Sequence, residues 1–304
     1  MRKFVISDIH GDGNVYYSVM GYLDNIKKKE DITLFINGDL IDRGLESAEI
    51  LLDLKKRIED NVFRIVYLGG NHELLMHQIY EKRKKNIVVS YDNVWHDNGG
   101  WTTENGLKDI FGYDEEKYLD VANFISNLKI FHMFDEKMLG KNIVLVHAAC
   151  PVDIVCNSNT CIKDDNSFVN YCVWTREIDP FIPFRCKIGN DNYFSIVGHT
   201  PNDNKYGYVY NKRENYLNID GGCSMYVSGF FSYDHVPLVE INDSYLKILT
   251  FNNNNEIIYG NYFDGNKSIL IDDKKLDDDR KYLNKNILIK KLMKFDDNTI
   301  GYED

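Results

Sequence analysis

Six residues that carry nitrogen or oxygen ligand atoms follow short apolar runs, and five separate segments of the chain supply them. They are Asp8, His10, Asp39, Asn71, His147 and His199. Carboxylate, amide and imidazole groups are hard or borderline ligands that suit divalent metal ions. Chance does not readily place so many of these groups in equivalent positions. The pattern therefore predicts a site for two metal ions.

The charge balance of such a site favours an anionic substrate. Two divalent ions bring four positive charges, whereas Asp8 and Asp39 return only two negative ones, because the histidines and Asn71 bind as neutral ligands. The local excess attracts an anion such as phosphate and lowers the pKa of a bridging water toward neutrality. Asp39 is the best candidate for the bridging ligand, since one carboxylate can bind two ions about 3.5–4 Å apart.

Four further residues suit phosphoryl chemistry without binding metal. Arg43 and Arg176 carry guanidinium groups that match phosphate oxygens, although a surface salt bridge is the alternative for each. His72 directly follows Asn71, so we expect it to face the site. A protonated His72 would donate to the leaving oxygen, and Asp42 would hold the orientation of its ring.

The apolar runs alternate with segments of helical spacing, as βαβ units require. The runs at residues 4–6, 34–36 and 65–68 each end in polar or glycine residues, and helical patterns of apolar residues separate them. Successive strand–loop–helix units imply a largely parallel inner sheet. The polar residues would then meet along one edge of that sheet, where open α/β sheets bind ligands.

The second half of the chain resumes this pattern and then changes. Runs at 143–146 and 194–197 again end in histidine-containing loops. From about residue 205 we expect antiparallel strands, at 216–219, 236–241 and 245–251. The fold class predicted is α/β with some α+β character.

We expect one catalytic domain over residues 1–262 and a C-terminal extension, 263–304, packed on it. A variable insert occupies about 86–140 and includes a helix around 115–127. In the extension, residues 287–293 would form one amphipathic element that docks on the body. Four cysteines cluster after His147 but lack the two close pairs of a structural zinc site: Cys150, Cys156, Cys161 and Cys172.

Composition excludes several classes of protein. The 304 residues include 36 Lys+Arg and 47 Asp+Glu, a net charge of −11, and 43% are hydrophobic. This argues against global disorder and against general binding to nucleic acid or anionic membranes. No apolar run reaches about 18 residues, and the N-terminus lacks a signal-peptide pattern. Six cysteines without tight pairing are typical of reduced thiols, so we expect a cytoplasmic protein.

Three motifs resemble the signatures of the phosphoprotein phosphatase family of metallophosphoesterases, in the same order and spacing. They are Ser7-Asp8-Ile9-His10-Gly11, Gly38-Asp39-Leu40-Ile41-Asp42-Arg43-Gly44 and Gly70-Asn71-His72-Glu73. Later segments resemble the bacterial and bacteriophage-lambda-type members: Trp95-x-x-Asn98-Gly99-Gly100-x-Thr102, His147-Ala-Ala, Trp174-Thr-Arg176-Glu, Gly198-His199-Thr-Pro201 and Asn218-Ile219-Asp220-Gly221-Gly222. The resemblance covers roughly residues 1–240.

The resemblance implies a division of the ligands between two metal ions. Asp8, His10 and Asp39 would hold one ion, and Asp39 would share the second with Asn71, His147 and His199. The same resemblance makes His72 and Asp42 the acid pair and makes Arg43 and Arg176 the phosphate-binding residues. The cofactors implied are two divalent ions, with manganese expected and iron or zinc as alternatives. The fold implied is a four-layer αββα sandwich of two mixed sheets flanked by helices, the calcineurin-like metallophosphoesterase fold.

Two residues depart from the family pattern near the site. Ser7 stands where glycine is usual, and Gly69 stands where arginine is common before Gly70-Asn71-His72-Glu73. Neither change removes a ligand. The loss of a charge at Gly69 bears on substrate preference and not on the reaction.

The function predicted is a protein serine/threonine phosphatase that uses a water activated by two metals and acts on phosphorylated proteins or peptides. A dinucleoside tetraphosphatase, or another small-molecule phosphoesterase, is the alternative on the same scaffold. Glu73 after His72 favours the protein-phosphatase branch. A third hypothesis is a phosphopeptide-binding protein without catalysis, which the complete ligand set argues against.

Overall fold

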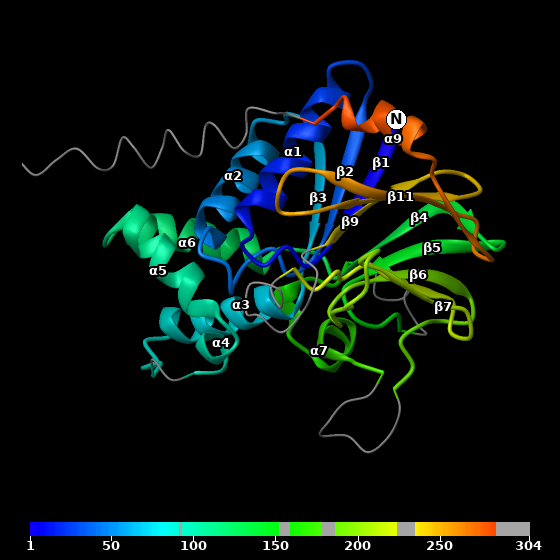
Figure 1. Cartoon of the computed structure of the whole chain (residues 1–304). Helices are drawn as coiled ribbons and strands as arrows, with labels where there is room; N and C mark the ends of the chain where they lie inside the picture. Colours follow the sequence, from blue (N-terminus) through cyan, green and yellow to red (C-terminus); the bar gives the residue numbers. More distant parts are fainter. Residues whose placement is uncertain (91–92, 152–158, 178–185, 224–234, 284–304) are drawn as a thin grey trace, which may run out of the picture.

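Two mixed β-sheets and their flanking helices build the protein (Figure 1). The structure, a computed structural model, describes residues 1–90, 93–151, 159–177, 186–223 and 235–283. One sheet has the strand order β12-β11-β10-β9-β1-β2-β3, and the other has the order β4-β5-β6-β8-β7. This arrangement confirms the expected α/β architecture of two sheets flanked by helices.

The larger sheet begins with the three parallel strands that the sequence predicts. They are β1 (Arg2–Ile6), β2 (Ile32–Asn37) and β3 (Arg64–Leu68). The antiparallel strands that extend this sheet from β1 are β9 (Val236–Ile241), β10 (Leu246–Phe251), β11 (Ile257–Phe263) and β12 (Ser268–Leu270). Because β1, β2 and β3 run in the same direction, their C-terminal loops lie at one edge.

The smaller sheet corrects one expectation. It contains β4 (Phe131–Met138), β5 (Lys141–Val146), β6 (Tyr193–Val197), β7 (Val209–Asn211) and β8 (Tyr216–Asn218). Strand β8 was expected to be antiparallel, but it pairs parallel with β6 and antiparallel only with β7. Strand β7 forms a hairpin with β8 at the outer edge, and this short strand gives no clear sequence signal. Strands β9 and β10 are antiparallel as expected.

Alternating side chains divide the core into two layers. In β1, Phe4 and Ile6 point into the core beneath the helices, whereas Val5 points between the two sheets. Leu34 and Ile36 of β2 likewise face the helices, and Phe35 faces the second sheet. A strand with both faces buried reads as a continuous apolar run, which is why these segments were recognisable.

The helices cover the outer faces and place loops at the strand ends. Helix α1 (Gly13–Lys27) begins at Asp12, whose side chain accepts from the backbone N–H of Val15. The other helices of the first half are α2 (Ser47–Glu59), α3 (Asn71–Lys84), α4 (Val94–Asp97), α5 (Gly100–Phe111) and α6 (Glu115–Ser126). The helix expected around 115–127 is thus present. Helix α7 (Ser167–Trp174) lies beside the smaller sheet.

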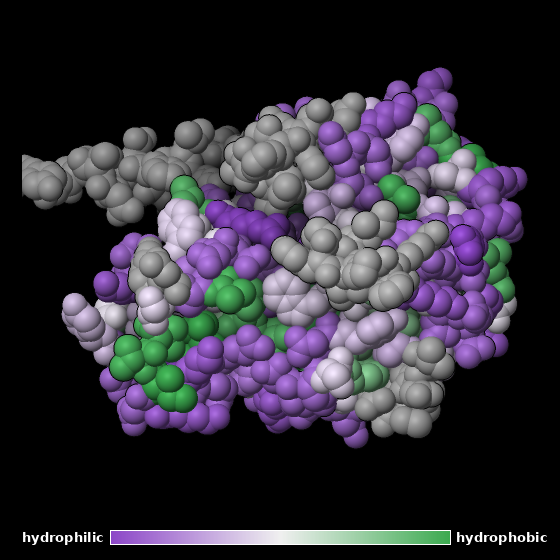
Figure 2. Space-filling view, turned by 90° about the horizontal axis from the view of Figure 1, so that it is seen from below, coloured by the Kyte–Doolittle hydropathy of each residue, from purple (hydrophilic) through white to green (hydrophobic). Residues whose placement is uncertain are grey.

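The segment that contains α4 and α5 combines a buried aromatic residue with an apolar surface. Trp95 is fully buried, whereas Val88 and Val94 are exposed. Figure 2 shows hydrophobic surface on the side of the molecule where α4 and α5 lie in Figure 1.

The part of the C-terminal extension that the structure describes packs on the body. In α9 (Asp273–Arg280), Leu276 is buried and Asp279 accepts hydrogen bonds from Tyr22 (3.1 Å) and Lys247 (2.7 Å). The amphipathic element expected at 287–293 lies outside the described residues. No described helix is long and apolar enough to cross a membrane.

Candidate metal centre

The predicted ligands converge at the C-terminal ends of the parallel strands, on loops with unusual backbone geometry. Asp8, His10, Asp39 and His199 all have positive φ, between 48° and 67°. Non-glycine residues rarely adopt this left-handed conformation, and proteins retain it mainly where function requires it. All six predicted ligands are buried.

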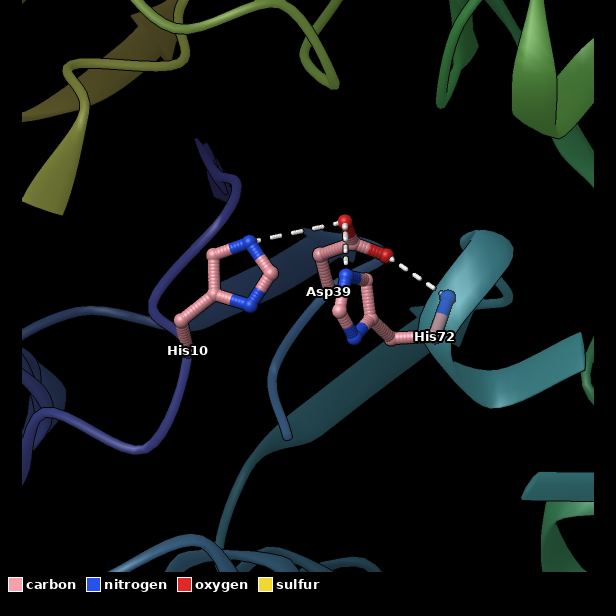
Figure 3. A group of neighbouring side chains, drawn as sticks. All are labelled: His10, Asp39 and His72. Carbon is pink, nitrogen blue, oxygen red and sulfur yellow. Dashed lines mark hydrogen bonds and ion pairs between the residues drawn. The ribbon is translucent and has the colours of Figure 1, made fainter. Parts of the chain in front are cut away.

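Asp39, His10 and His72 form the first of two donor groups found among the described residues (Figure 3). The Nε2 atoms of His10 and His72 lie 3.5 and 3.9 Å from Oδ2 of Asp39. The backbone N–H of His72 donates to the other oxygen, Oδ1, at 3.2 Å. One ligand atom from each of the three residues lies within 4.8 Å of the others, a spacing that one metal ion can span.

Asp39, His147 and His199 form the second donor group. Nε2 of His147 lies 3.3 Å from Oδ1 of Asp39. The side-chain oxygen of Asn71 joins this group, at 3.1 Å from His147 and 2.8 Å from His199. The two oxygens of Asp39 thus face different groups, which is the arrangement a bridging carboxylate needs.

The hydrogen bonds behind the second group show that it suits a cation. His147 Nδ1 lies 2.7 Å from the carbonyl of Asn37, and His199 Nε2 lies 3.1 Å from the carbonyl of Trp174. If each of these nitrogens carries its ring's proton, the other ring nitrogen presents a lone pair. Those lone pairs then converge with the oxygens of Asn71 and Asp39, and a metal ion satisfies all of them.

His10 is oriented in the same way for the first group. Its Nδ1 faces the carbonyl of Ile41 at 3.1 Å, which leaves Nε2 as the ligand atom. Nε2 of His10 lies 3.1 Å from Nη1 of Arg43, and Nε2 of His72 lies 3.0 Å from Nη2. The guanidinium therefore lies directly beside this donor group.

Asp8 is placed beside the two groups and belongs to neither. One carboxylate oxygen receives the hydroxyl of Ser7, and the other accepts from the backbone N–H of His199 at 3.0 Å. Burial and the nearby Asp220 carboxylate raise the pKa of Asp8 well above its usual range. Asp8 thus lies at the site. The three residues whose ligand atoms lie within 4.8 Å of one another in the first group are His10, Asp39 and His72.

Burial and neighbouring charges give the two groups different protonation. Burial lowers the pKa of His10 and His199 well below the usual value, and Arg43 adds to the effect on His10. Burial acts in the same direction on His147, but the carboxylate of Asp39 outweighs it and raises the pKa to about 10. Burial alone would raise the pKa of Asp39, yet His147 and His72 hold it well below its usual range.

His72 and Asp42 form a fully buried pair. His72 Nδ1 donates to Oδ2 of Asp42 at 2.8 Å, and neither side chain is exposed. Nε2 of His72 is thereby directed toward Asp39, as Figure 3 shows. The same nitrogen lies beside Arg43. This is the orientation that the sequence predicts for an acid whose ring is held by a carboxylate.

Arg176, the second predicted phosphate-binding residue, lies near Thr200. It is partly exposed, and its Nη1 donates to Thr200 at 3.3 Å. Burial lowers the pKa of Arg176, while the carboxylates of Asp220, Asp39 and Asp8 act in the opposite sense. The charges of Asp39 and Asp8 thus act on this guanidinium, which remains charged at neutral pH.

Two site residues received no role from the sequence. Glu73 is fully buried and accepts from the backbone N–H groups of Asp39 (2.9 Å), Leu40 (3.1 Å) and Gly70 (2.8 Å) and from the Tyr67 hydroxyl (2.6 Å). It therefore fixes the loop that carries the bridging carboxylate.

Asp220 is the second such residue. It lies buried near Asp8 and Arg43, and burial raises its pKa to about 6. The sequence feature that could have identified Asp220 is its position in Asn218-Ile219-Asp220-Gly221-Gly222, directly after a strand.

The cysteines that the structure describes form no metal group with one another. Cys150 and Cys172 are buried free thiols, and burial raises the pKa of both. Cys156 lies outside the described residues.

The family model for calcineurin-like phosphoesterases matches residues 1–229. The chain belongs to this family. A curated relative, the asymmetrical bis(5'-nucleosyl)-tetraphosphatase PrpE of Bacillus velezensis, is 30% identical over 233 residues, 73% of this chain and 85% of the relative. The resemblance to phosphoprotein-phosphatase-type metallophosphoesterases is therefore confirmed, and the enzyme is a metallophosphoesterase.

A solved structure shares the fold of this chain. It is a protein serine/threonine phosphatase from Saccharomyces cerevisiae with similarity to human phosphatase PP5. The match has a TM-score of 0.55 at 16% identity and covers 83% of this chain and 80% of that chain. Divalent metal ions follow from the family and fit the two donor groups.

Proposed function

We propose that this calcineurin-like phosphoesterase hydrolyses phosphate monoesters of alcohols, with phosphoserine and phosphothreonine in proteins as its substrates. The observation that supports this assignment is the His72–Asp42 pair, joined at 2.8 Å and fully buried. An alkoxide is a poor leaving group and needs a proton, whereas a nucleotide phosphate leaves without a strong acid. General acid catalysis is worth about 10²–10⁴-fold when the leaving group requires it.

The residues of the site have distinct tasks in this reaction. His72, protonated at Nε2, donates to the leaving oxygen, and Asp42 holds the ring through Nδ1. Arg43 and Arg176 bind the phosphate oxygens and counter the charge that develops on them. Asp8, His10 and Asp39 would hold one divalent ion, and Asp39, Asn71, His147 and His199 would hold the other. His72 lies among the donors of the first group but is left free to act as the acid. Bound ions would supply an activated water and a clamp on the phosphate.

The substrate class is tested by a comparison of kcat/KM for purified protein on a phosphoserine peptide, a phosphothreonine peptide and diadenosine tetraphosphate, each with Mn²⁺. We expect the phosphopeptides to be preferred. A preference for diadenosine tetraphosphate by tenfold or more would overturn the assignment. The same assay with Zn²⁺ or Fe²⁺ identifies the metal that supports turnover.

Hydrolysis of dinucleoside tetraphosphates is the second candidate, and the relationship to PrpE favours it. The product of such a cleavage leaves as a nucleotide, so the acid pair contributes less to that reaction. An unaltered rate on diadenosine tetraphosphate in His72→Asn, together with high wild-type activity on it, would support this second function.

A further inference from the structure

The loop that carries Asp42 and Arg43 has a strained backbone. Asp42 has φ of 72° and Arg43 has φ of 70°, so two successive non-glycine residues occupy the left-handed region. A single such residue is already uncommon, and a pair persists only where the surroundings hold it in place. The contacts that hold this loop come from residues 95–103, which lie in the variable insert and include the segment Trp95-x-x-Asn98-Gly99-Gly100-x-Thr102.

Trp95 and Thr103 together satisfy the carboxylate of Asp42. The indole Nε1–H of Trp95 donates to Oδ2 at 2.8 Å, the same oxygen that accepts from His72. The hydroxyl of Thr103 donates to Oδ1 at 2.5 Å and accepts from the backbone N–H of Asp42 at 3.0 Å. Trp95, Thr103 and Asp42 are all fully buried. Each oxygen of the carboxylate therefore has a fixed donor from the insert.

Two glycines between Trp95 and Thr103 permit this close packing. The carbonyl of Gly99 accepts from the backbone N–H of Arg43 at 3.1 Å. Gly99 has φ of 94°, and a Cβ there would lie 2.8 Å from Cγ of Arg43. A Cβ on Gly100 would lie 2.3 Å from Nε1 of Trp95. The Gly99–Gly100 pair thus lets one backbone turn contact both Arg43 and the indole that binds Asp42.

We propose that Trp95 and Thr103 are positioning residues for the general acid. They fix the rotamer of Asp42 so that its Oδ2 holds Nδ1 of His72, and Nε2 of His72 then points at the leaving oxygen. This inference rests on the proposed role of His72. A free Asp42 carboxylate could rotate and release the ring, because His72 supplies only one of the three side-chain donors that hold it.

Substitutions that remove single donors test this role. Trp95→Phe keeps the ring and removes the N–H, and Thr103→Val keeps the shape and removes the hydroxyl. Partners that orient metal-binding histidines are typically worth about 10–100-fold, and we expect an effect of similar size for the partners that orient His72 through Asp42. We expect both variants to lose that much kcat on phenyl phosphate and much less on p-nitrophenyl phosphate, whose leaving group is more acidic. KM and metal content should stay near wild type.

Matched variants separate positioning from folding. Thr103→Ser keeps the hydroxyl and should restore the rate on phenyl phosphate. Trp101→Phe, at a partly exposed position of the same segment, should leave both rates unchanged. Equal losses on both aryl phosphates in Trp95→Phe and Thr103→Val, or no loss on either, would overturn the proposal.

A double-mutant cycle shows whether Trp95 acts through His72. In the His72→Asn background, Trp95→Phe should cause no further loss on phenyl phosphate, because the group that it positions is gone. A full additional loss would overturn the proposal. The aryl phosphates test it whatever the natural substrate is. Failure to hydrolyse phosphoserine peptides would count against the proposed function alone.

Discussion

The two donor groups that share Asp39 differ in charge although both contain histidines. In the first, His10 is neutral at pH 7, and the guanidinium of Arg43 lies 3.1 Å from its ligand nitrogen. In the second, the pKa of His147 is raised to about 10, and Asn71 supplies an uncharged oxygen. A metal ion must therefore enter the first group beside a fixed cation and enter the second by displacing a proton.

The difference shows how one carboxylate can serve two roles in the absence of metal. Asp39 stabilises a proton on His147 through Oδ1, and its Oδ2 faces His10 and His72. Metal binding replaces this proton with an ion of higher charge. The ligand atoms are therefore already in place, and the exchange of a proton for a metal ion takes place at Asp39 and His147.

Asp39→Asn should have the largest effect, because the two donor groups share this carboxylate. Asp39→Asn keeps the shape of the side chain and removes the negative charge that both groups share. We expect loss of turnover and loss of stoichiometric binding of the second ion, measured by metal analysis after dialysis. Asp31→Asn, at an exposed position, is the control. A fully active Asp39→Asn enzyme that carries two ions contradicts the assignment of the bridge.

A pH series distinguishes the two groups. In the metal-free protein His147 is protonated below about pH 10, and an ion needs its lone pair. Affinity at the second group should therefore rise by about tenfold per pH unit between pH 6 and 8, while the already neutral His10 adds no such dependence. Calorimetry in buffers of different ionisation enthalpy should detect about one proton released. Two binding steps with no proton release contradict the comparison.

Arg176→Ala should have a smaller effect that is confined to the substrate. A hydrogen bond to a charged group contributes about 1.5–3 kcal/mol, so we expect KM for a phosphomonoester to rise by roughly ten- to a hundredfold. Inhibition by free phosphate should weaken in parallel, with little change in melting temperature. Arg213→Ala, at an exposed position, serves as the control. A lower melting temperature with unchanged KM indicates a structural salt bridge.

Tyr67→Phe should have the smallest effect, because it changes only a hydrogen bond to Glu73, the residue that fixes the loop of Asp39. It removes one donor to Glu73, whose carboxylate still accepts from three backbone N–H groups. We expect a decrease of about 1–3 kcal/mol in the free energy of unfolding, measured in urea, with kcat retained. Tyr113→Phe, almost fully exposed, should change neither quantity. A large loss of kcat with normal stability would show that Tyr67 acts in catalysis.

The sequence predicted the parts of the site that local patterns encode. Each of the six predicted ligands follows a buried apolar run: Asp8, His10, Asp39, Asn71, His147 and His199. Such runs can be recognised in a sequence because both faces of the strands are buried. The acid pair was also predicted, since Asp42 and His72 belong to two recognisable motifs.

Contacts between distant segments could not be predicted in the same way. Trp95 and Thr103 reach Asp42 across 53 and 61 residues, and no local periodicity encodes such a bond. Glu73 was assigned only as a feature of the motif, because its three backbone partners appear only when the loops are folded. The parallel pairing of β8 was missed for a related reason: a three-residue strand carries too little pattern to show its direction.

The most direct test of the central claim is the leaving-group dependence of His72→Asn. The variant and wild type are compared for kcat/KM on a phosphoserine peptide and on p-nitrophenyl phosphate, with the metal content of each protein measured. We predict that both ions remain, that the rate on phosphoserine falls by about 10²–10⁴-fold, and that the rate on p-nitrophenyl phosphate falls far less. Equal losses on both substrates, or a missing ion in the variant, would contradict the role of His72 as the acid.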